Sequence, residues 1–184
     1  MKRALFIGRF QPFHNAHLLD IKQILKEVDE VIIAIGSSQE KNTLENPFSY
    51  NERKQMIINV LKINKIKSYR NKVSGELKNK KFLSNYKIYP VPDLYNDKKW
   101  VNYIKKTLPK YDYVYSGNTW TLRCFKKHDS KVKKIKLIKG VSSTIVRNMI
   151  IKNKNWKEMV PEDISKYIEK IKGVERVKKI YSKE

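Results

Sequence analysis

"FIGRFQPFHNAH", residues 6–17, joins the end of an apolar run to the start of a helical pattern. The run "RALFIG" (3–8) is short and apolar and ends in glycine, which is typical of a buried strand. Apolar residues then recur at helical spacing over 15–27, which predicts a helix, and Pro12 forces a turn before it. The stretch therefore predicts the opening strand, turn and helix of an alternating α/β fold.

Apolar segments continue to alternate along the chain. The β-branched run "EVIIAIG" (30–36) is typical of a buried parallel strand. Further strands are predicted over 86–93, 111–118 and 132–138, and further helices over 49–62, 98–108, 119–127, 142–152 and 161–172. This order predicts a single α/β domain over 1–184, built on a doubly wound parallel sheet. Two segments are predicted to add to it, a basic insertion at 62–85 and a C-terminal helix and tail at 160–184.

Length and composition narrow the class of protein. A chain of 184 residues is long enough to bury one core. Its one cysteine, Cys124, excludes an internal disulfide and favours a reducing cytoplasm. No apolar stretch approaches the length of a membrane span, so we expect a soluble cytoplasmic protein with no membrane partner.

The net charge of +23 raises the question of nucleic-acid binding. Lysine supplies 34 of the 41 basic residues. Arginine is the better planar, bidentate phosphate ligand, so a surface built for nucleic acid would be expected to use more of it. The composition favours solvated lysine-rich faces, and nucleic-acid binding stays as a disfavoured alternative.

The opening stretch also carries candidate chemistry. His14 and His17, two of the three histidines, straddle the start of the predicted helix. Arg9 adds a permanent charge, and Gly8 lets the backbone approach a ligand. Helix N-termini attract anions, so these groups predict a phosphate site. The alternative is two ordinary structural histidines.

A second motif, "VSSTIVRNMI" (141–150), repeats this chemistry. Hydroxyls and free N–H groups at a helix start suit phosphate oxygens, and Arg147 lies one turn inside the helix. The alternative is a capping run with a solvent-exposed arginine. Polar or small residues also follow the predicted strands, where parallel sheets bind ligands, and we expect them to converge there: Gly8, Gly36, Asp93 and Ser116–Asn118.

"GRFQPFHNAH" resembles the G-R-F-Q-P-F-H-x-G-H run of archaeal-type nicotinamide mononucleotide (NMN) adenylyltransferases, in the nucleotidylyltransferase superfamily with its H-x-G-H signature. Ala16 stands where that family has glycine. "VSSTIVR" is similar to the second signature, I-S-S-T-x-x-R, with Val141 in place of isoleucine. Three further segments resemble the family: 35–57, the aspartate–tryptophan loop at 90–101, and "YSGN" (115–118). Asn96 stands one place early in that loop.

The resemblance implies a Rossmann-like nucleotidylyltransferase fold and the reaction of ATP with NMN to give NAD and diphosphate. It implies catalytic roles for His14, His17, Arg147 and Arg9. It implies that ATP and its phosphates bind at Gly8, Arg9, His14, His17, Gly117, Asn118, Ser142, Ser143, Thr144 and Arg147. It implies that NMN binds at Phe10, Ser37, Asp93 and Trp100, with the indole of Trp100 stacked on the nicotinamide ring.

The same resemblance implies a homo-oligomer and Mg²⁺ carried by the ATP phosphates, because the sequence offers no cluster of metal ligands. One alternative is the same chemistry on another phosphorylated acceptor, such as phosphopantetheine, FMN or a polyol phosphate. The choice between NMN and nicotinic acid mononucleotide stays open.

Overall fold

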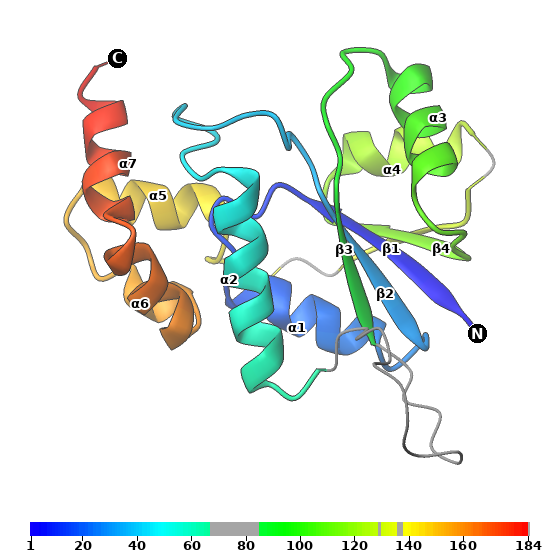
Figure 1. Cartoon of the computed structure of the whole chain (residues 1–184), viewed down its shortest axis with the longest axis horizontal. Coiled ribbons are helices and arrows are strands. Elements are labelled where there is room, and N and C mark those ends of the chain that lie inside the picture. The colour runs from blue at the N-terminus through cyan, green and yellow to red at the C-terminus, as the bar shows by residue number, and fades with distance from the viewer. Residues whose placement is uncertain (67–84, 129, 136–137, 184) are drawn as a thin grey trace, which may run out of the picture.

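The protein is built on one sheet of five parallel strands, in the order β3-β2-β1-β4-β5 (Figure 1). The computed structural model describes residues 1–66, 85–128, 130–135 and 138–183. The strands are β1 (Arg3–Gly8), β2 (Glu30–Ile35), β3 (Tyr86–Pro90), β4 (Tyr113–Ser116) and β5 (Val132–Lys134). The predicted parallel α/β sheet is confirmed.

Helices cover both faces of this sheet (Figure 1). They are α1 (Asn15–Ile24), α2 (Tyr50–Ile63), α3 (Asp97–Thr107), α4 (Thr119–Lys126), α5 (Ser143–Ile151), the 3-10 turn η1 (Lys157–Met159), α6 (Glu162–Lys170) and α7 (Gly173–Tyr181). Successive strand residues point to opposite faces. Phe6 therefore packs in the core with α1, α2, α5, α6 and α7, and Leu5 packs in the core with α3 and α4.

The chain reverses its direction across the sheet at β1. It runs outward from β1 through β2 to β3, and α3 then carries it back to β4, which pairs with the other side of β1. The gap between the carboxyl ends of β1 and β4 is thus the switch point of the sheet. Parallel α/β sheets bind ligands at such points.

The C-terminal segment differs from the prediction of one helix and a tail. It forms two helices, α6 and α7, which are separated at Lys172, where φ is 53°. A Cβ atom on Gly173 would lie 2.8 Å from the Phe48 ring and 2.9 Å from Ile168. Glycine therefore lets α7 pack directly against Phe48.

Two other predictions can be compared only with the part of the chain that the structure describes. Most of the basic segment 62–85 lies outside them, and only its first residues belong to α2 and the turn after it. In the part of the chain that the structure describes, no helix is both long enough and apolar enough to cross a membrane.

Candidate active site

A cavity of about 240 Å³ opens at the carboxyl ends of β1 and β4. Its walls come from three distant parts of the chain: the turn and helix after β1, the loop after β4, and the segment that leads into α5. The predicted site residues that line it are Arg9, Phe10, His14, His17, Gly117, Asn118, Ser142, Ser143, Thr144 and Arg147. The two motifs that the sequence analysis singled out thus meet at the switch point.

The two histidines form a stacked pair at the N-terminus of α1. His14 is the N-cap residue, and the ring centroids of His14 and His17 lie 3.6 Å apart with an interplanar angle of 18°. The backbone N–H of His14 donates to Nδ1 of His17 over 3.2 Å. This hydrogen bond assigns the proton of a neutral His17 to Nε2, which can then donate to a ligand.

Nδ1 of His14 is buried and has no hydrogen-bond partner among the described residues. Such an atom is costly to bury unless a ligand or water meets it. Burial lowers the pKa of His14 to about 4. Burial, and then the nearby His14, lower the pKa of His17 well below its ordinary value. Both imidazoles are therefore neutral near pH 7.

Acid should destabilise the protein through His14. The unfolded chain binds a proton at His14 below about pH 6.5, whereas the folded protein resists it until about pH 4. The free energy of unfolding is therefore unaffected by His14 above about pH 6.5. Between about pH 6.5 and pH 4 it falls with the pH, by up to about 1.4 kcal/mol per pH unit. Between pH 7 and 5, we expect urea unfolding to show the wild type losing about 2 kcal/mol more than a His14→Gln variant. Parallel pH curves for the two proteins would contradict this.

Helix α5 is fixed to the turn that precedes α1. The Ser143 hydroxyl donates to the Pro12 carbonyl over 2.9 Å, and Nη1 of Arg147 donates to the Gln11 carbonyl over 2.8 Å. Nη2 of Arg147 lies 3.4 Å from the Thr144 hydroxyl. The proton of Ser143 is therefore used to position the helix. Arg147 has five N–H donors, so it keeps donors for an anion in the cavity.

Ser142 caps α5, because its hydroxyl oxygen accepts from the backbone N–H of Ile145 over 3.2 Å. The hydroxyl proton of Ser142 and the first N–H groups of the helix are thus not used by the cap. Asn118 has the same role at α4, where its side chain accepts from the backbone N–H of Thr121. The N-termini of α1, α4 and α5 therefore all lie at this cavity. Each helix N-terminus favours negative charge.

Arg9 is an exposed guanidinium at the rim of the cavity. It forms an ion pair with Glu45, and this pairing lowers the pKa of that carboxyl. Burial, followed by the positive charge of Arg9, lowers the pKa of Arg147. Two arginines therefore line one cavity, and among the described residues only the exposed one, Arg9, has a carboxylate partner. An anionic ligand can replace Glu45 at little cost, since exposed ion pairs contribute little to stability.

The residues assigned to NMN lie mostly outside this cavity. Ser37 and Asp93 follow β2 and β3, and the backbone N–H of Asp93 donates to the Gln39 side chain over 3.1 Å. Trp100 is 5% exposed, and its ring lies 5.2 Å from that of Trp120, which is 41% exposed. Of these two indoles, Trp120 presents the open aromatic surface.

Gly8 and Phe10 act together in the structure. A Cβ atom on Gly8 would lie 3.0 Å from the ring of Phe10, which is buried. The space over the glycine is thus filled by this ring, which packs against Phe6, Phe13 and His17. Phe10 contributes to the cavity wall as part of the core beneath the histidines.

Arg53, which was not among the predicted site residues, is 0% exposed. Nη1 donates to the carbonyls of Arg9 and Gly36 over 2.9 and 2.8 Å, and Nη2 donates to the carbonyl of Ser37 over 3.0 Å. Arg53 thereby fixes the ends of β1 and β2 relative to each other. The position had a signal, since 53 precedes the apolar residues 56, 57 and 60 on the inner face of the helix.

Phe10 and Ser37 both need this support. Their φ angles are 54° and 47°, in the left-handed region that costs a residue with a side chain about 1–2 kcal/mol. Arg53 donates to the carbonyl of Arg9, which precedes Phe10, and to the carbonyl of Ser37 itself. The buried guanidinium therefore holds the two turns from which the site is built.

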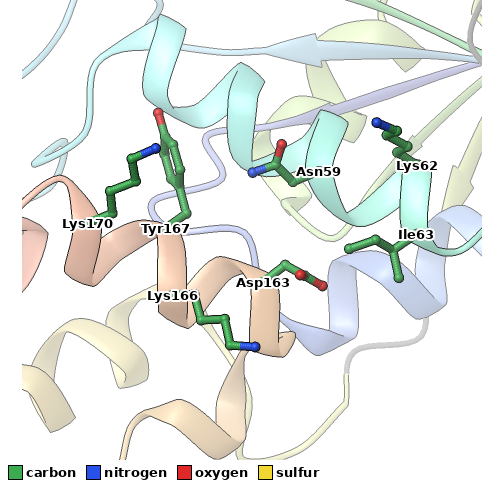
Figure 2. A pocket seen from close by; sticks show the side chains of 7 residues that line it. All are labelled: Asn59, Lys62, Ile63, Asp163, Lys166, Tyr167 and Lys170. Carbon is green, nitrogen blue, oxygen red and sulfur yellow. The ribbon is translucent and has the colours of Figure 1, made fainter.

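Larger hollows lie elsewhere, but they lack this chemistry. One of about 620 Å³ lies between α2 and α6, and Figure 2 shows its side chains coming from both helices. It contains none of the predicted site residues. Its cations are the exposed lysines Lys62, Lys166 and Lys170, of which Lys166 pairs with Glu162. The smaller cavity at the switch point is the candidate active site.

Comparison with known proteins identifies the family of the chain. The sequence profile described as cytidylyltransferase-like matches residues 5–149. The chain belongs to this family. The match contains the histidine pair and Arg147, so the family region carries both motifs.

This cytidylyltransferase-like chain has curated archaeal relatives. It is 39% identical to the nicotinamide-nucleotide adenylyltransferase of Methanococcus aeolicus, over 99% of this chain and 96% of the relative. It is 40% identical to that of Saccharolobus solfataricus, over 98% and 97% of the two chains. A crystal structure of a bifunctional NMN adenylyltransferase/ADP ribose pyrophosphatase from Francisella tularensis matches with a TM-score of 0.69 and 24% identity. That match covers 91% of this chain and 50% of the other, and it supports the fold.

Proposed function

We propose that the protein transfers the adenylyl group of ATP to NMN and releases NAD and diphosphate. The observation that carries the proposal is the stacked histidine pair, which lines the same cavity as Arg147. The archaeal relatives of the same length and the same name support it.

The reaction needs positioning and charge stabilisation rather than an enzyme nucleophile. An oxygen of the NMN 5′-phosphate forms a bond to the α-phosphorus of ATP. The bond from this phosphorus to the oxygen that bridges to the β-phosphate breaks, and diphosphate leaves with that electron pair. Negative charge shifts from the incoming phosphate to the leaving group, so fixed donors along this path accelerate the step.

Each cavity residue has a place along that path. Nε2–H of His17 would donate to an α-phosphate oxygen, and His14, whose Nδ1 has no described partner, would donate to a neighbouring phosphate. Arg147 and the N-terminal N–H groups of α5 would hold the β- and γ-phosphates and then the leaving diphosphate. Arg9 would exchange Glu45 for the phosphate of NMN.

Mg²⁺ would enter with ATP as part of the substrate. Among the described residues, no group of three or more histidine, cysteine or carboxylate side chains is placed to hold a metal ion. Asp20 is the only carboxylate among the described residues that line the cavity. Mg²⁺ commonly keeps several waters and binds phosphate oxygens, which suits a site of this composition.

The pyridinium ring of NMN would meet the pair of indoles. It is flat and cationic, and such rings bind well to aromatic faces. Trp120 presents the open surface, and the buried ring of Trp100 lies 5.2 Å from it. Asp93 would contribute a carboxylate from the loop that Gln39 holds. Phe10 and Ser37 would act through the backbone turns that they form.

The test is product formation by the purified protein with ATP, Mg²⁺ and NMN, followed by chromatography. We expect NAD and diphosphate in equal amounts. Parallel reactions replace NMN with nicotinic acid mononucleotide, phosphopantetheine or FMN. If calorimetry shows ATP binding but neither pyridine nucleotide is adenylylated, NMN is the wrong acceptor and the proposal fails.

A further inference from the structure

Asp20 is an acidic residue in a cavity whose other charged residues, in the part of the chain that the structure describes, are the arginines Arg9 and Arg147. It lies on α1, one turn beyond His17, and lines the same cavity. The carboxyl is partly buried, and no hydrogen bond or ion pair joins it to another of the described residues. A carboxyl group brings no positive charge to phosphate oxygens, and its ionised form would repel them. Asp20 is therefore better suited to a different part of the nucleotide.

The direction of α1 indicates which part. The phosphates belong at the N-terminus of the helix, beside His14 and His17. With a rise of 1.5 Å per residue, Asp20 lies about 9 Å beyond His14 along the helix axis. A nucleotide that has its phosphates at the helix start and extends along α1 would have its nucleoside part in reach of Asp20.

The surroundings of Asp20 suit a base. A second hollow of about 860 Å³ lies beside the cavity, and Asp20, Ile135 and Ile138 line both. Two apolar side chains and one carboxyl therefore mark the junction between them. A flat heteroaromatic ring needs apolar contact on its faces and a polar group at its edge.

We infer that Asp20 binds the base of the nucleoside triphosphate and hydrogen-bonds the 6-amino group of adenine at this junction. The inference adds a specificity-determining residue to the proposed function and rests on it only in taking ATP as the nucleotide.

The state of the carboxyl favours this contact. Burial raises the pKa of Asp20 to about 7, so near neutrality much of it is protonated. A protonated carboxyl accepts from the 6-amino group and donates to N1 of adenine, whereas a carboxylate can only accept. Asparagine carries the same pair of one acceptor and one donor, so it is the conservative replacement.

Calorimetry without NMN tests the inference and does not depend on turnover. We expect Asp20→Ala to weaken ATP binding about 10-fold, since about 1.4 kcal/mol corresponds to one factor of ten. Asp20→Asn should stay within about 3-fold of the wild type. Inorganic tripolyphosphate, which has no base, should bind all three proteins equally. Leu19→Ala is the matched control, because Leu19 is exposed and lines the second hollow but not the cavity.

A nucleotide analogue locates the contact on the base. Purine riboside triphosphate lacks the 6-amino group, and the wild type should bind it about 10-fold more weakly than ATP. Asp20→Ala should bind the two nucleotides within about 2-fold of each other. The wild-type comparison needs no variant and so stands even if a variant fails to fold. Unchanged ATP binding by Asp20→Ala, or tighter binding of tripolyphosphate, would overturn the inference.

Discussion

Replacement of His17 by alanine should lower kcat for NAD formation by about 100- to 1,000-fold. Its Nε2–H is directed by the hydrogen bond at Nδ1 and needs no reorientation as charge develops on the α-phosphate. The loss should fall on kcat more than on the KM for ATP, because Arg147 and the helix N-termini still hold the other phosphates.

Steady-state kinetics of His17→Ala beside His128→Ala measures this effect. His128 is the remaining histidine and does not line the cavity, so its variant should keep wild-type activity. The thermal midpoints of both variants show whether the fold is intact. A His17→Ala enzyme that keeps more than a tenth of the wild-type kcat would remove His17 from the catalytic group.

Arg53→Met should lower the free energy of unfolding by about 3 kcal/mol. The Arg9 and Gly36 carbonyls lose their donor, at about 1–3 kcal/mol each, whereas the Ser37 carbonyl keeps the backbone N–H of Glu40 over 3.0 Å. Relief from burying a guanidinium offsets part of that loss. The expected fall in Tm is about 6–12 °C for a chain of this length. Arg53→Lys should recover little, because one ammonium does not reproduce the fork that reaches three carbonyls.

Urea and thermal unfolding of Arg53→Met and Arg123→Met check this prediction. Arg123 is an exposed arginine on α4, and its replacement should change stability by less than about 0.5 kcal/mol. The Arg53 variant should also bind ATP more weakly, since the turn that carries Arg9 loses its support. Equal stability of the two variants would show that the carbonyls find other donors.

Much of the fold follows from local patterns. Apolar runs and helical spacing predicted all five strands and the helices α1 to α6, and most of these elements bury apolar residues on at least one face. The strands β3, β4 and β5 end before the predicted boundaries. Val91 and Ile135, which follow β3 and β5, are apolar, so the local pattern does not mark these strand ends. The second C-terminal helix was missed, since its packing depends on contact between Gly173 and the distant Phe48.

The phosphate end of the cavity was predictable because its residues lie in short motifs at helix starts. The structure brings 9–17 and 142–147 to one cavity, as their chemistry suggested. The other end was not predictable. Asp20 falls in a helical pattern where a carboxylate is ordinarily solvated, and only the fold places it in the cavity. The contact between the rings of Trp100 and Trp120 was also not predictable, because the two residues lie on different helices.

The attachment of α5 to the turn after β1 also bears on the order in which the protein is made. The histidines leave the ribosome early, but Ser143 and Arg147, which bind the Pro12 and Gln11 carbonyls, are synthesised only after most of the chain. A nascent chain therefore has an incomplete cavity at the switch point for most of its synthesis. A ligand of this cavity, such as the proposed ATP, can stabilise the protein by binding only once this late segment has closed onto the early one.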